Sequence, residues 1–268
     1  MKARKHIISK IWIGITLLFL YIPIITMMIF SFNEKRSLSV WGGFSLKWYA
    51  KLFAGRQMME AVANTLVIAV IATIVSVIIG VITAIGLSKS RKIIRAIVLN
   101  ISDLPMLNPE IVTAIGLMLL FTAIGLPKGF VTVLLAHIIF CIPYVILSIL
   151  PKIRSLDENL VEAAMDLGAT PFQALIKVIL PQLKPSIIAG ALIAFTMSFD
   201  DYIISYFVTG NGFKNVSILV STMGRRTNPS VNALSTLFVL VIFLGLVLYN
   251  IAMLISKKKG VNKYAKNS

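Results

Sequence analysis

Four carboxylates lie inside long apolar stretches of this 268-residue chain. They are Asp103, Glu110, Asp200 and Asp201, out of ten Asp and Glu in all. An ionised side chain at the centre of a bilayer costs roughly 2.5–3.5 kcal/mol, so these four must face protein or water rather than lipid. The apolar stretches contain no Lys or Arg. The interior field is therefore expected to be negative, which favours a cationic solute and disfavours anions.

Spacing limits which of these carboxylates can act together. Asp103 and Glu110 are seven residues apart and share a face of a continuous helix, whereas Asp200 and Asp201 diverge by about 100°. Asp103 lies near the expected cytoplasmic end of its stretch, so it is a weaker candidate for contact with cargo. We expect at least one of Glu110, Asp200 and Asp201 to contact cargo. The alternative is interhelical hydrogen bonding, with a protonated carboxyl group.

Two other reactive residue types give weaker signals. His137 has no carboxylate on its own predicted helix, and Cys141, four residues on, would not by itself complete a metal site. We therefore expect a hydrogen-bonded core histidine and no metal site. Cys141 is the single cysteine and has apolar neighbours in sequence, which is typical of a small core residue. No catalytic residue and no cofactor are predicted.

The composition places these residues in an all-α membrane protein. Hydrophobic residues make up 58% of the chain and charged residues 13%, with a mean hydropathy of +0.92. Soluble domains average about 45–50% apolar and about 25% charged. Because lipid-exposed backbone must bond internally and the apolar runs do not alternate, helices are predicted. The net charge of +16 comes from clusters at the ends of apolar runs, so no nucleic-acid partner is expected.

Six stretches are long enough to span a membrane, which needs about 20 apolar residues. They cover residues 11–32, 62–87, 97–124, 130–150, 187–208 and 231–255. Pro105 and Pro109 each remove a backbone hydrogen bond from the third, so a kink or break is expected near residues 102–110. Broken helices at membrane depth often line a binding cavity, although a plain structural kink is an equal alternative.

The basic residues also predict an orientation. One set of loops and termini carries 17 Lys and Arg and the other carries 9, which places both termini and the loop around Glu162 in the cytoplasm of a multi-pass plasma (inner) membrane protein. Three regions are predicted: residues 1–61 with the first span and an extracytoplasmic aromatic loop, a core over residues 62–256, and a basic cytoplasmic tail over residues 257–268.

The predicted extracytoplasmic loop at residues 33–61 is rich in aromatic side chains among basic ones. This composition suits a helix lying in the headgroup region of the lipid. Trp48 is either an aromatic anchor at the membrane interface, the more common role, or a gate for the substrate.

The predicted cytoplasmic loop at residues 152–185 is amphipathic and indicates two short helices. Asp157 and Glu158 suit a helix N-terminus, and Gly168 suits a helix end that needs a left-handed residue. Pro171 is well placed to start the second helix.

The same loop resembles the EAA signature of ATP-binding-cassette importer permeases. The matching residues are Glu162, Ala163 and Ala164, then Gly168, then Leu180 and Pro181, with Val178 where the family usually has Ile. Residues 44–49, 108–112, 198–201 and 205–210 further resemble the C-type permease subunit of spermidine/putrescine importers. This resemblance covers nearly the whole chain.

The resemblance implies a type-1, MetI-like importer permease fold with six membrane helices. It implies that the loop, through the EAA residues, forms coupling helices that dock on an ATPase dimer and rock the spans by alternating access. It also implies a homologous second permease, an extracytoplasmic polyamine-binding protein, and a polyamine pathway near Trp48, Glu110, Asp200 and Asp201. The chain lacks the G-x-x-x-x-G-K-[ST] phosphate loop, so ATP hydrolysis is expected on another subunit.

Two rival functions remain open. A permease of the same class for iron or another small cation would also suit a negative interior. A secondary transporter that uses the carboxylates as a proton relay needs no ATPase, but it leaves the cytoplasmic motif unexplained.

Overall fold

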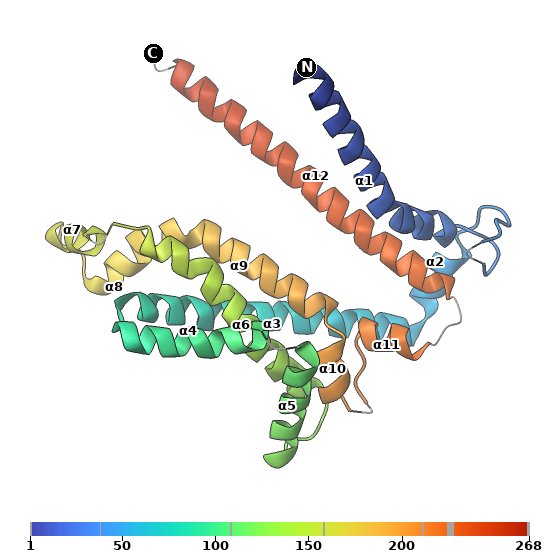
Figure 1. Ribbon diagram of the computed structural model, residues 1–268, viewed down its shortest axis with the longest axis horizontal. Coiled ribbons are helices and arrows are strands. Elements are labelled where there is room, and N and C mark those ends of the chain that lie inside the picture. The colour runs from blue at the N-terminus through green and yellow to red at the C-terminus, as the bar shows by residue number, and fades with distance from the viewer. Residues whose placement is uncertain are drawn as a thin grey trace. The chain divides into compact units, whose positions relative to one another are not determined.

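The computed structural model describes residues 2–37, 39–107, 109–157, 159–210, 212–223 and 228–266. These residues are mainly helical, and the one strand-like pairing among them is an isolated bridge between Asn33 and Phe44. The predicted all-α class is therefore confirmed. Figure 1 shows the order of the helices: α1 (Lys2–Ser31), α2 (Lys47–Ala54), α3 (Arg56–Lys89), α4 (Lys92–Leu107), α5 (Glu110–Ala123), α6 (Phe130–Arg154), α7 (Leu160–Asp166), α8 (Pro171–Ala174), α9 (Leu180–Asp200), α10 (Ile203–Val208), α11 (Val216–Thr222) and α12 (Pro229–Lys266).

The chain forms two compact units. Unit 1 comprises Met1–Met59 and Met223–Ser268, and unit 2 comprises Glu60–Thr222. In unit 1, helices α1 and α2 both pack on α12. The loop between α1 and α2 is organised by Asn33, whose side-chain amide donates to the carbonyls of Ser37 and Val40 and whose side-chain oxygen accepts from the amide of Gly42.

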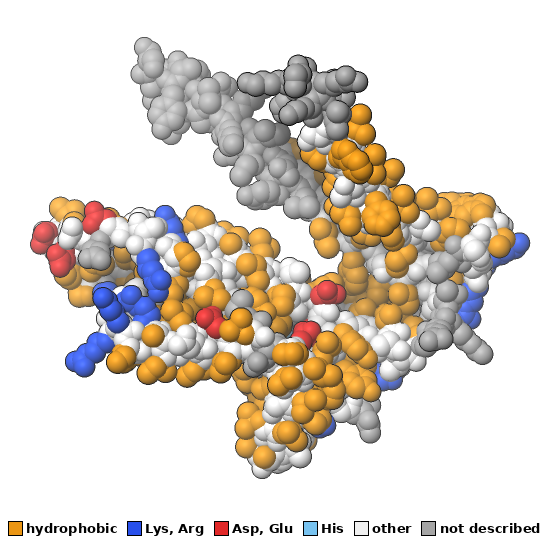
Figure 2. Space-filling view, in the orientation of Figure 1, with side chains coloured by type: hydrophobic (Ala, Val, Ile, Leu, Met, Phe, Trp, Pro, Cys, Tyr) orange, Lys and Arg blue, Asp and Glu red, His pale blue; other side chains and the backbone are white. Residues whose placement is uncertain are grey.

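Apolar helix surfaces are widely exposed, as expected for a protein that faces lipid. Figure 2 shows hydrophobic side chains over much of the visible surface. In α1, every side chain from residue 9 to residue 27 is exposed. In water such a surface would be a liability for aggregation, whereas in a bilayer it needs no partner.

Four helical segments are long and apolar enough to cross a membrane: Ser9–Ser31, Arg56–Lys89, Phe130–Arg154 and Pro171–Asp200. The first three correspond to the predicted first, second and fourth spans. At the predicted third and sixth spans the described residues form the shorter apolar helices Glu110–Ala123 and Pro229–Gly245. The count of six spans stays a prediction.

The predicted break in the third span is confirmed. Helix α4 ends at Leu107 and α5 begins at Glu110, with Pro109 in an extended conformation (φ −53°, ψ 132°) as the N-cap of α5. Proline fits there because the first residues of a helix have no intrahelical acceptor for their N–H groups. Asn108 lies outside the described residues.

The fifth span was predicted as one helix over residues 187–208, and this is wrong in two respects. At its start, the helix is continuous from Pro171 through α8, a π-helical turn (Leu175–Ile179) and α9. Leu180 donates its N–H to the carbonyl of Leu175, and Pro181 has none to donate. At its end, α9 stops at Asp200, Asp201 is extended (φ −62°, ψ 128°), and α10 begins at Ile203.

Of the two short helices predicted in the loop at residues 152–185, the first is confirmed as α7. The second begins at Pro171 as predicted, but it is the start of the continuous helix to Asp200 and not a separate short helix. Gly168 has φ +88°, its N–H donates to the carbonyl of Met165, and the N–H of Ala169 donates to the carbonyl of Ala164. This pair of bonds is a Schellman motif, which favours glycine because other residues are strained at positive φ. Thr170 then caps α8. Glu158 lies outside the described residues.

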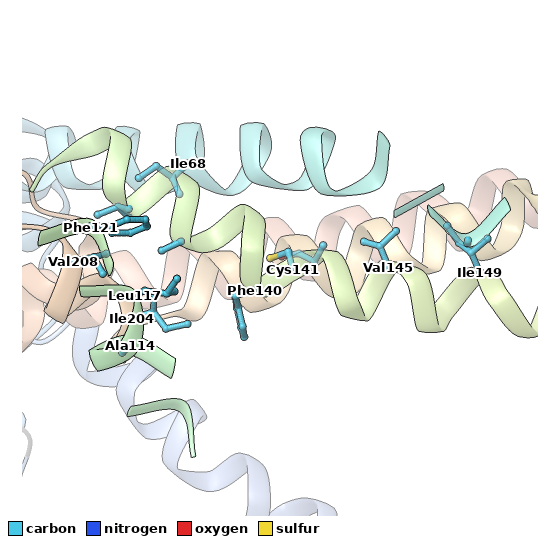
Figure 3. Packing of buried hydrophobic residues seen from close by; sticks show 14 of the residues in the cluster. Ile68, Ala114, Leu117, Phe121, Phe140, Cys141, Val145, Ile149, Ile204 and Val208 are labelled. Carbon is cyan, nitrogen blue, oxygen red and sulfur yellow. The ribbon is translucent and has the colours of Figure 1, made fainter. Parts of the chain in front are cut away.

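Helix α6 is at the centre of unit 2. Its buried side chains pack with those of α3, α5, α9 and α10 (Figure 3). Two glycines let neighbouring helices approach closely at Val145: an added Cβ at Gly80 of α3 would lie 2.6 Å from Val145 Cγ1, and one at Gly190 of α9 would lie 3.4 Å from Val145 Cα. Small residues at such crossings are typical of membrane helix packing.

Candidate functional site

The buried carboxylate of Asp201 holds the start of α10. Its Oδ1 accepts the N–H of Ile204 at 3.1 Å, and its Oδ2 accepts the N–H of Ser205 at 2.8 Å. These are N–H groups of the first turn, which have no partner within the helix. A carboxylate at this position also interacts favourably with the helix dipole. Asp201 thus explains why the polypeptide leaves α9 and restarts as α10.

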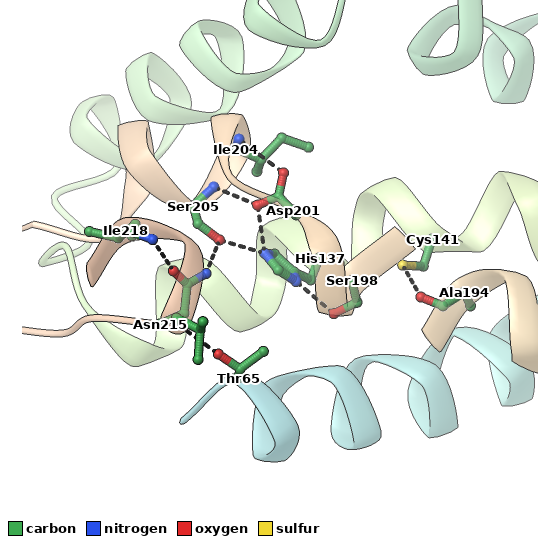
Figure 4. Close-up of polar contacts among 11 residues, drawn as sticks. Thr65, His137, Cys141, Ala194, Ser198, Asp201, Ile204, Ser205, Asn215 and Ile218 are labelled. Carbon is green, nitrogen blue, oxygen red and sulfur yellow. Dashed lines mark hydrogen bonds and ion pairs between the residues drawn. The ribbon is translucent and has the colours of Figure 1, made fainter. Parts of the chain in front are cut away.

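His137 of α6 holds the same carboxylate from the opposite side. Its Nε2 lies 3.2 Å from Asp201 Oδ2 and 3.0 Å from Ser205 Oγ, and its Nδ1 lies 2.7 Å from Ser198 Oγ (Figure 4). Because a carboxylate only accepts, Nε2 carries the hydrogen that Asp201 receives. The His137 side chain is 1% exposed and that of Asp201 is 0% exposed. The predicted core histidine is confirmed, and its carboxylate partner on another helix was not foreseen.

The network continues through α11 to α3. Asn215 donates to Ser205 Oγ at 2.9 Å and accepts the N–H of Ile218. Thr65 Oγ1 on α3 accepts the N–H of Val216, also at 2.9 Å (Figure 4). Polar side chains from α3, α6 and α9 through α11 therefore meet in one buried hydrogen-bonded cluster. Such a fully bonded cluster rigidifies its surroundings, because each lost partner would leave a buried polar group unsatisfied.

The residue types of a hydrolytic triad occur together here, as Ser198, His137 and Asp201. Their environment does not suit hydrolysis. Ser198 is 2% exposed, so no substrate reaches its hydroxyl, and Nε2 is shared between Asp201 and Ser205. A nucleophile needs an open position beside it for the reacting carbonyl and its oxyanion. The arrangement is suited to holding helices together.

The other two predicted cargo carboxylates are more open than Asp201. Asp200 is exposed and Glu110, the first residue of α5, is half-buried. The opposite environments of Asp200 and Asp201 agree with the predicted divergence of their side chains. Glu110 lies within electrostatic range of both aspartates. Unit 2 therefore gathers three carboxylates where α5 and α10 pack together. Asp103, on α4, is half-buried.

Trp48 belongs to unit 1, whereas the three carboxylates belong to unit 2. Its side chain is buried in α2, with an exposure of 8%, and Nε1–H donates to the carbonyl of Asn33 at 2.7 Å. Lys47 and Lys51 place their Nζ atoms 4.9 and 5.8 Å from the centroid of the indole ring. These contacts fix the α1–α2 loop onto α2.

The EAA residues lie on the exposed loop between α6 and α9. Helix α7, which carries Glu162, Ala163 and Ala164, has no buried residue. Leu167 and Phe172 are 90% and 69% exposed. Leu180 and Pro181 follow the π-helical turn.

Beneath this loop, unit 2 has a cavity of about 800 Å³ lined mainly by apolar side chains of α3, α6 and α8. Lys89, Arg95 and Arg154 contribute positive charges to its lining. Arg95 donates to the carbonyls of Leu87 and Ser88 and thereby caps the end of α3.

A second cavity, of about 560 Å³, lies between the 125–129 and 209–215 loops of unit 2. Its lining includes Lys128 and Lys214 and, among the described residues, no carboxylate. Its charge is therefore unsuited to a cation. Cys141 is fully buried, with its Sγ 3.4 Å from the carbonyl oxygen of Ala194, as a small core residue should be.

Comparisons with known proteins agree with this architecture. Residues 76–259 match the family model described as binding-protein-dependent transport system inner membrane component. The chain is 36% identical to the spermidine/putrescine transport system permease protein PotC of Escherichia coli K12, over 90% of each chain. It is 40% identical to the putrescine transport system permease protein PotI of the same organism, over 82% of this chain and 81% of that protein.

Solved structures show the same fold. A bacterial ABC transporter involved in the import of the acidic polysaccharide alginate has a chain that superposes with a TM-score of 0.69 at 18% identity, covering 94% of this chain and 96% of that one. An amino acid ABC transporter with histidines gives a TM-score of 0.57 at 21% identity, covering 76% of this chain and 96% of that one. The chain has the MetI-like permease fold and is a transport permease rather than an enzyme. It belongs to the inner membrane components of binding-protein-dependent transport systems, the permeases of ABC importers.

Proposed function

We propose that the chain is a permease subunit of an ATP-driven importer that moves polyamines of the spermidine and putrescine type into the cytoplasm. The observation that carries the proposal is the cluster of Glu110, Asp200 and Asp201 in unit 2, in spans that contain no Lys or Arg. A linear polycation needs several negative groups along its path, each weak enough to release it. The relatives PotC and PotI are named for polyamine transport.

Aromatic side chains beside Asp200 support the same cargo. Tyr202 and Tyr206 are 39% and 53% exposed, and their ring centroids lie 5.6 Å apart. Ammonium groups are attracted to the faces of such rings, and the methylene segments of a polyamine pack against them. Asp200 lies two residues before Tyr202 in the sequence and is exposed, whereas Tyr206 also lines the cavity that contains Lys128 and Lys214. Trp48 has its indole N–H occupied, so we propose that it acts as an anchor at the membrane interface.

We further propose that the loop at residues 152–185 couples the permease to a separate ATPase dimer. Glu162, Ala163, Ala164 and Gly168 lie on or just after a helix with no buried residue, and Leu167 exposes an apolar side chain at its end. An apolar tip on a polar loop suits insertion into a groove of a partner subunit. Closure of the ATPases would move this loop, and the continuous helix from Pro171 to Asp200 would carry the movement to Asp200.

The complete importer would contain a second, homologous permease and an extracytoplasmic polyamine-binding protein. A structural neighbour solved with a periplasmic protein bound to alginate pentasaccharide supports this kind of partner. We propose six spans within lipid, both termini in the cytoplasm, and the predicted regions 1–61, 62–256 and 257–268. The excess of basic residues on the proposed cytoplasmic side supports this orientation.

The proposal is tested by uptake into proteoliposomes. The chain is reconstituted with the second permease, the ATPase and the binding protein of the same importer, and uptake of labelled spermidine and putrescine is measured with and without internal ATP. We expect ATP-dependent uptake that an uncoupler does not abolish. Uptake of ferric iron in place of polyamines would support the rival cargo, and collapse with the uncoupler at constant ATP would support a proton-coupled transporter.

A further inference from the structure

At the junction between α9 and α10, one side chain from outside both helices contacts residues on both sides of the break. Ser198 lies near the end of α9, Asp201 lies in the break, and Ser205 lies in α10. His137 on α6 contacts all three, through Nδ1 at 2.7 Å and through Nε2 at 3.2 and 3.0 Å. Asp200, the exposed carboxylate, is the residue immediately before this break.

We propose that His137 is a positioning residue for transport: by holding Asp201 as the acceptor for the first N–H groups of α10, it fixes the break that sets Tyr202 and α10 relative to the exposed Asp200 at the cargo site. The inference rests on the proposed function for the identity of the cargo. Each ring nitrogen has a distinct task. Nε2 holds the capping carboxylate of Asp201, and Nδ1 holds Ser198 of α9.

Helix geometry explains why this contact controls the direction of α10 relative to Asp200. The break contains no proline and no glycine, so covalent geometry does not enforce it. The first N–H groups of α10 have Asp201 as their acceptor. If Asp201 turns away, the N–H groups of Ile204 and Ser205 lose their acceptor, and the backbone at the break is no longer held in one conformation. The orientation of Tyr202 and α10 relative to Asp200 would then no longer be fixed.

Two amide substitutions separate the tasks of the two nitrogens. In His137→Gln the terminal amide lies near the position of Nε2 and can still donate to Asp201. In His137→Asn the amide lies near the position of Nδ1 and reaches Ser198 alone. The two variants are similarly polar and uncharged. Ser198→Ala is the matched control on the other side of the ring, since it removes the Nδ1 contact and leaves Asp201 held.

The experiment uses the assembled transporter in proteoliposomes and measures the KM and the maximal rate of spermidine uptake. It also measures hydrogen exchange of the backbone amides of Ile204 and Ser205. For His137→Asn we expect a KM about tenfold higher, a maximal rate within about twofold, and lost protection of both amides. For His137→Gln and Ser198→Ala we expect a KM within about threefold and retained protection.

Several outcomes of the comparison between the His137 and Ser198 variants would overturn the proposal. Equal effects of His137→Asn and His137→Gln, or an assembled His137→Asn variant with unchanged KM, would show that the Asp201 contact does not position the cargo site. If His137→Asn fails to assemble, a strongly raised KM in His137→Gln or in Ser198→Ala overturns the proposal. Lack of polyamine uptake by the unsubstituted complex would instead refute the proposed function, and hydrogen exchange would still decide whether His137 holds the break.

Discussion

Asp200 and Asp201 are adjacent in sequence but lie in opposite environments, which suit different roles. Asp201 is 4% exposed and accepts two backbone N–H groups, whereas Asp200 is exposed. A buried carboxylate with its lone pairs occupied has little capacity left for a passing cation. An exposed carboxylate can exchange water for an ammonium group at small cost. The negative charge of Asp201 still contributes to the field at Glu110.

Neutralising the two aspartates should therefore have different consequences. We expect Asp200→Asn to raise the KM for spermidine about three- to tenfold and to leave the amount of assembled complex unchanged, because it removes an exposed charge near the cargo. We expect Asp201→Asn to destabilise the complex by roughly 1–3 kcal/mol, because the amide nitrogen cannot accept one of the two N–H groups of α10.

Uptake kinetics and thermal unfolding of the purified complex measure the two effects separately. Asp103→Asn serves as a control for general loss of negative charge, since Asp103 is half-buried on α4 and is not part of the α9–α10 junction. If Asp200→Asn lowered the melting temperature and Asp201→Asn acted only on KM, the assignment of roles would be reversed, and the proposed positioning of α10 by His137 and Asp201 would fail with it.

The break before α5 could be predicted from the sequence, whereas the break after α9 could not. The first break was predictable because Pro109 has no backbone N–H group and disfavours the helical conformation in the residue before it. The break after α9 has no such residue, and we predicted a single helix there. Aspartate is favoured at helix N-termini, so Asp201 carried a weak signal. Its contact with His137 joins residues 64 apart in sequence, and no local pattern encodes such a pairing.

The loop at residues 152–185 was the most predictable element because its signals are local. Gly168 has the positive φ that its position after a helix implied, and Pro171 begins α8. An added Cβ at Gly168 would meet nothing within 4 Å. Glycine is therefore required at this position for its positive φ and not for lack of space. The two explanations predict different effects for residues that tolerate a positive φ and for residues that do not.

A bulky, β-branched residue at Gly168 should uncouple transport from ATP hydrolysis. We expect Gly168→Val to lower the amount of spermidine imported per ATP hydrolysed, because a left-handed conformation costs such a residue roughly 1–2 kcal/mol and distorts the connection between α7 and α8. Gly168→Asn should retain most coupling, since Asn tolerates this conformation. Parallel measurements of uptake and phosphate release test this. Equal defects in both variants would show that bulk, not φ, matters.

At the scale of the whole molecule, the surface explains what composition alone could and could not predict. The exposed apolar side chains of α1 fit lipid, as the composition implied. The number of spans was harder to predict, because breaks divide the apolar stretches into helices of 14 residues in α5 and six residues in α10. Neither helix alone crosses a hydrocarbon layer of about 30 Å. Several helix pieces must share the crossing.

Orientation can be tested on a core helix that is long enough to cross the membrane. Helix α6 has 25 residues and is about 37 Å long, so the loops at its two ends should lie on opposite sides of the membrane. With the buried Cys141 replaced by Ala, Pro127→Cys and Leu167→Cys each provide one exposed thiol.

We expect a membrane-impermeant maleimide to label Pro127→Cys in intact cells and Leu167→Cys only after lysis, because the basic residues place the Leu167 loop in the cytoplasm. The reverse pattern would put the loop out of reach of any cytoplasmic ATPase and would refute the coupling role of Gly168. Labelling of both thiols from outside would mean that α6 does not cross the membrane. The buried pair of His137 and Asp201 would then have no membrane-spanning helices to position.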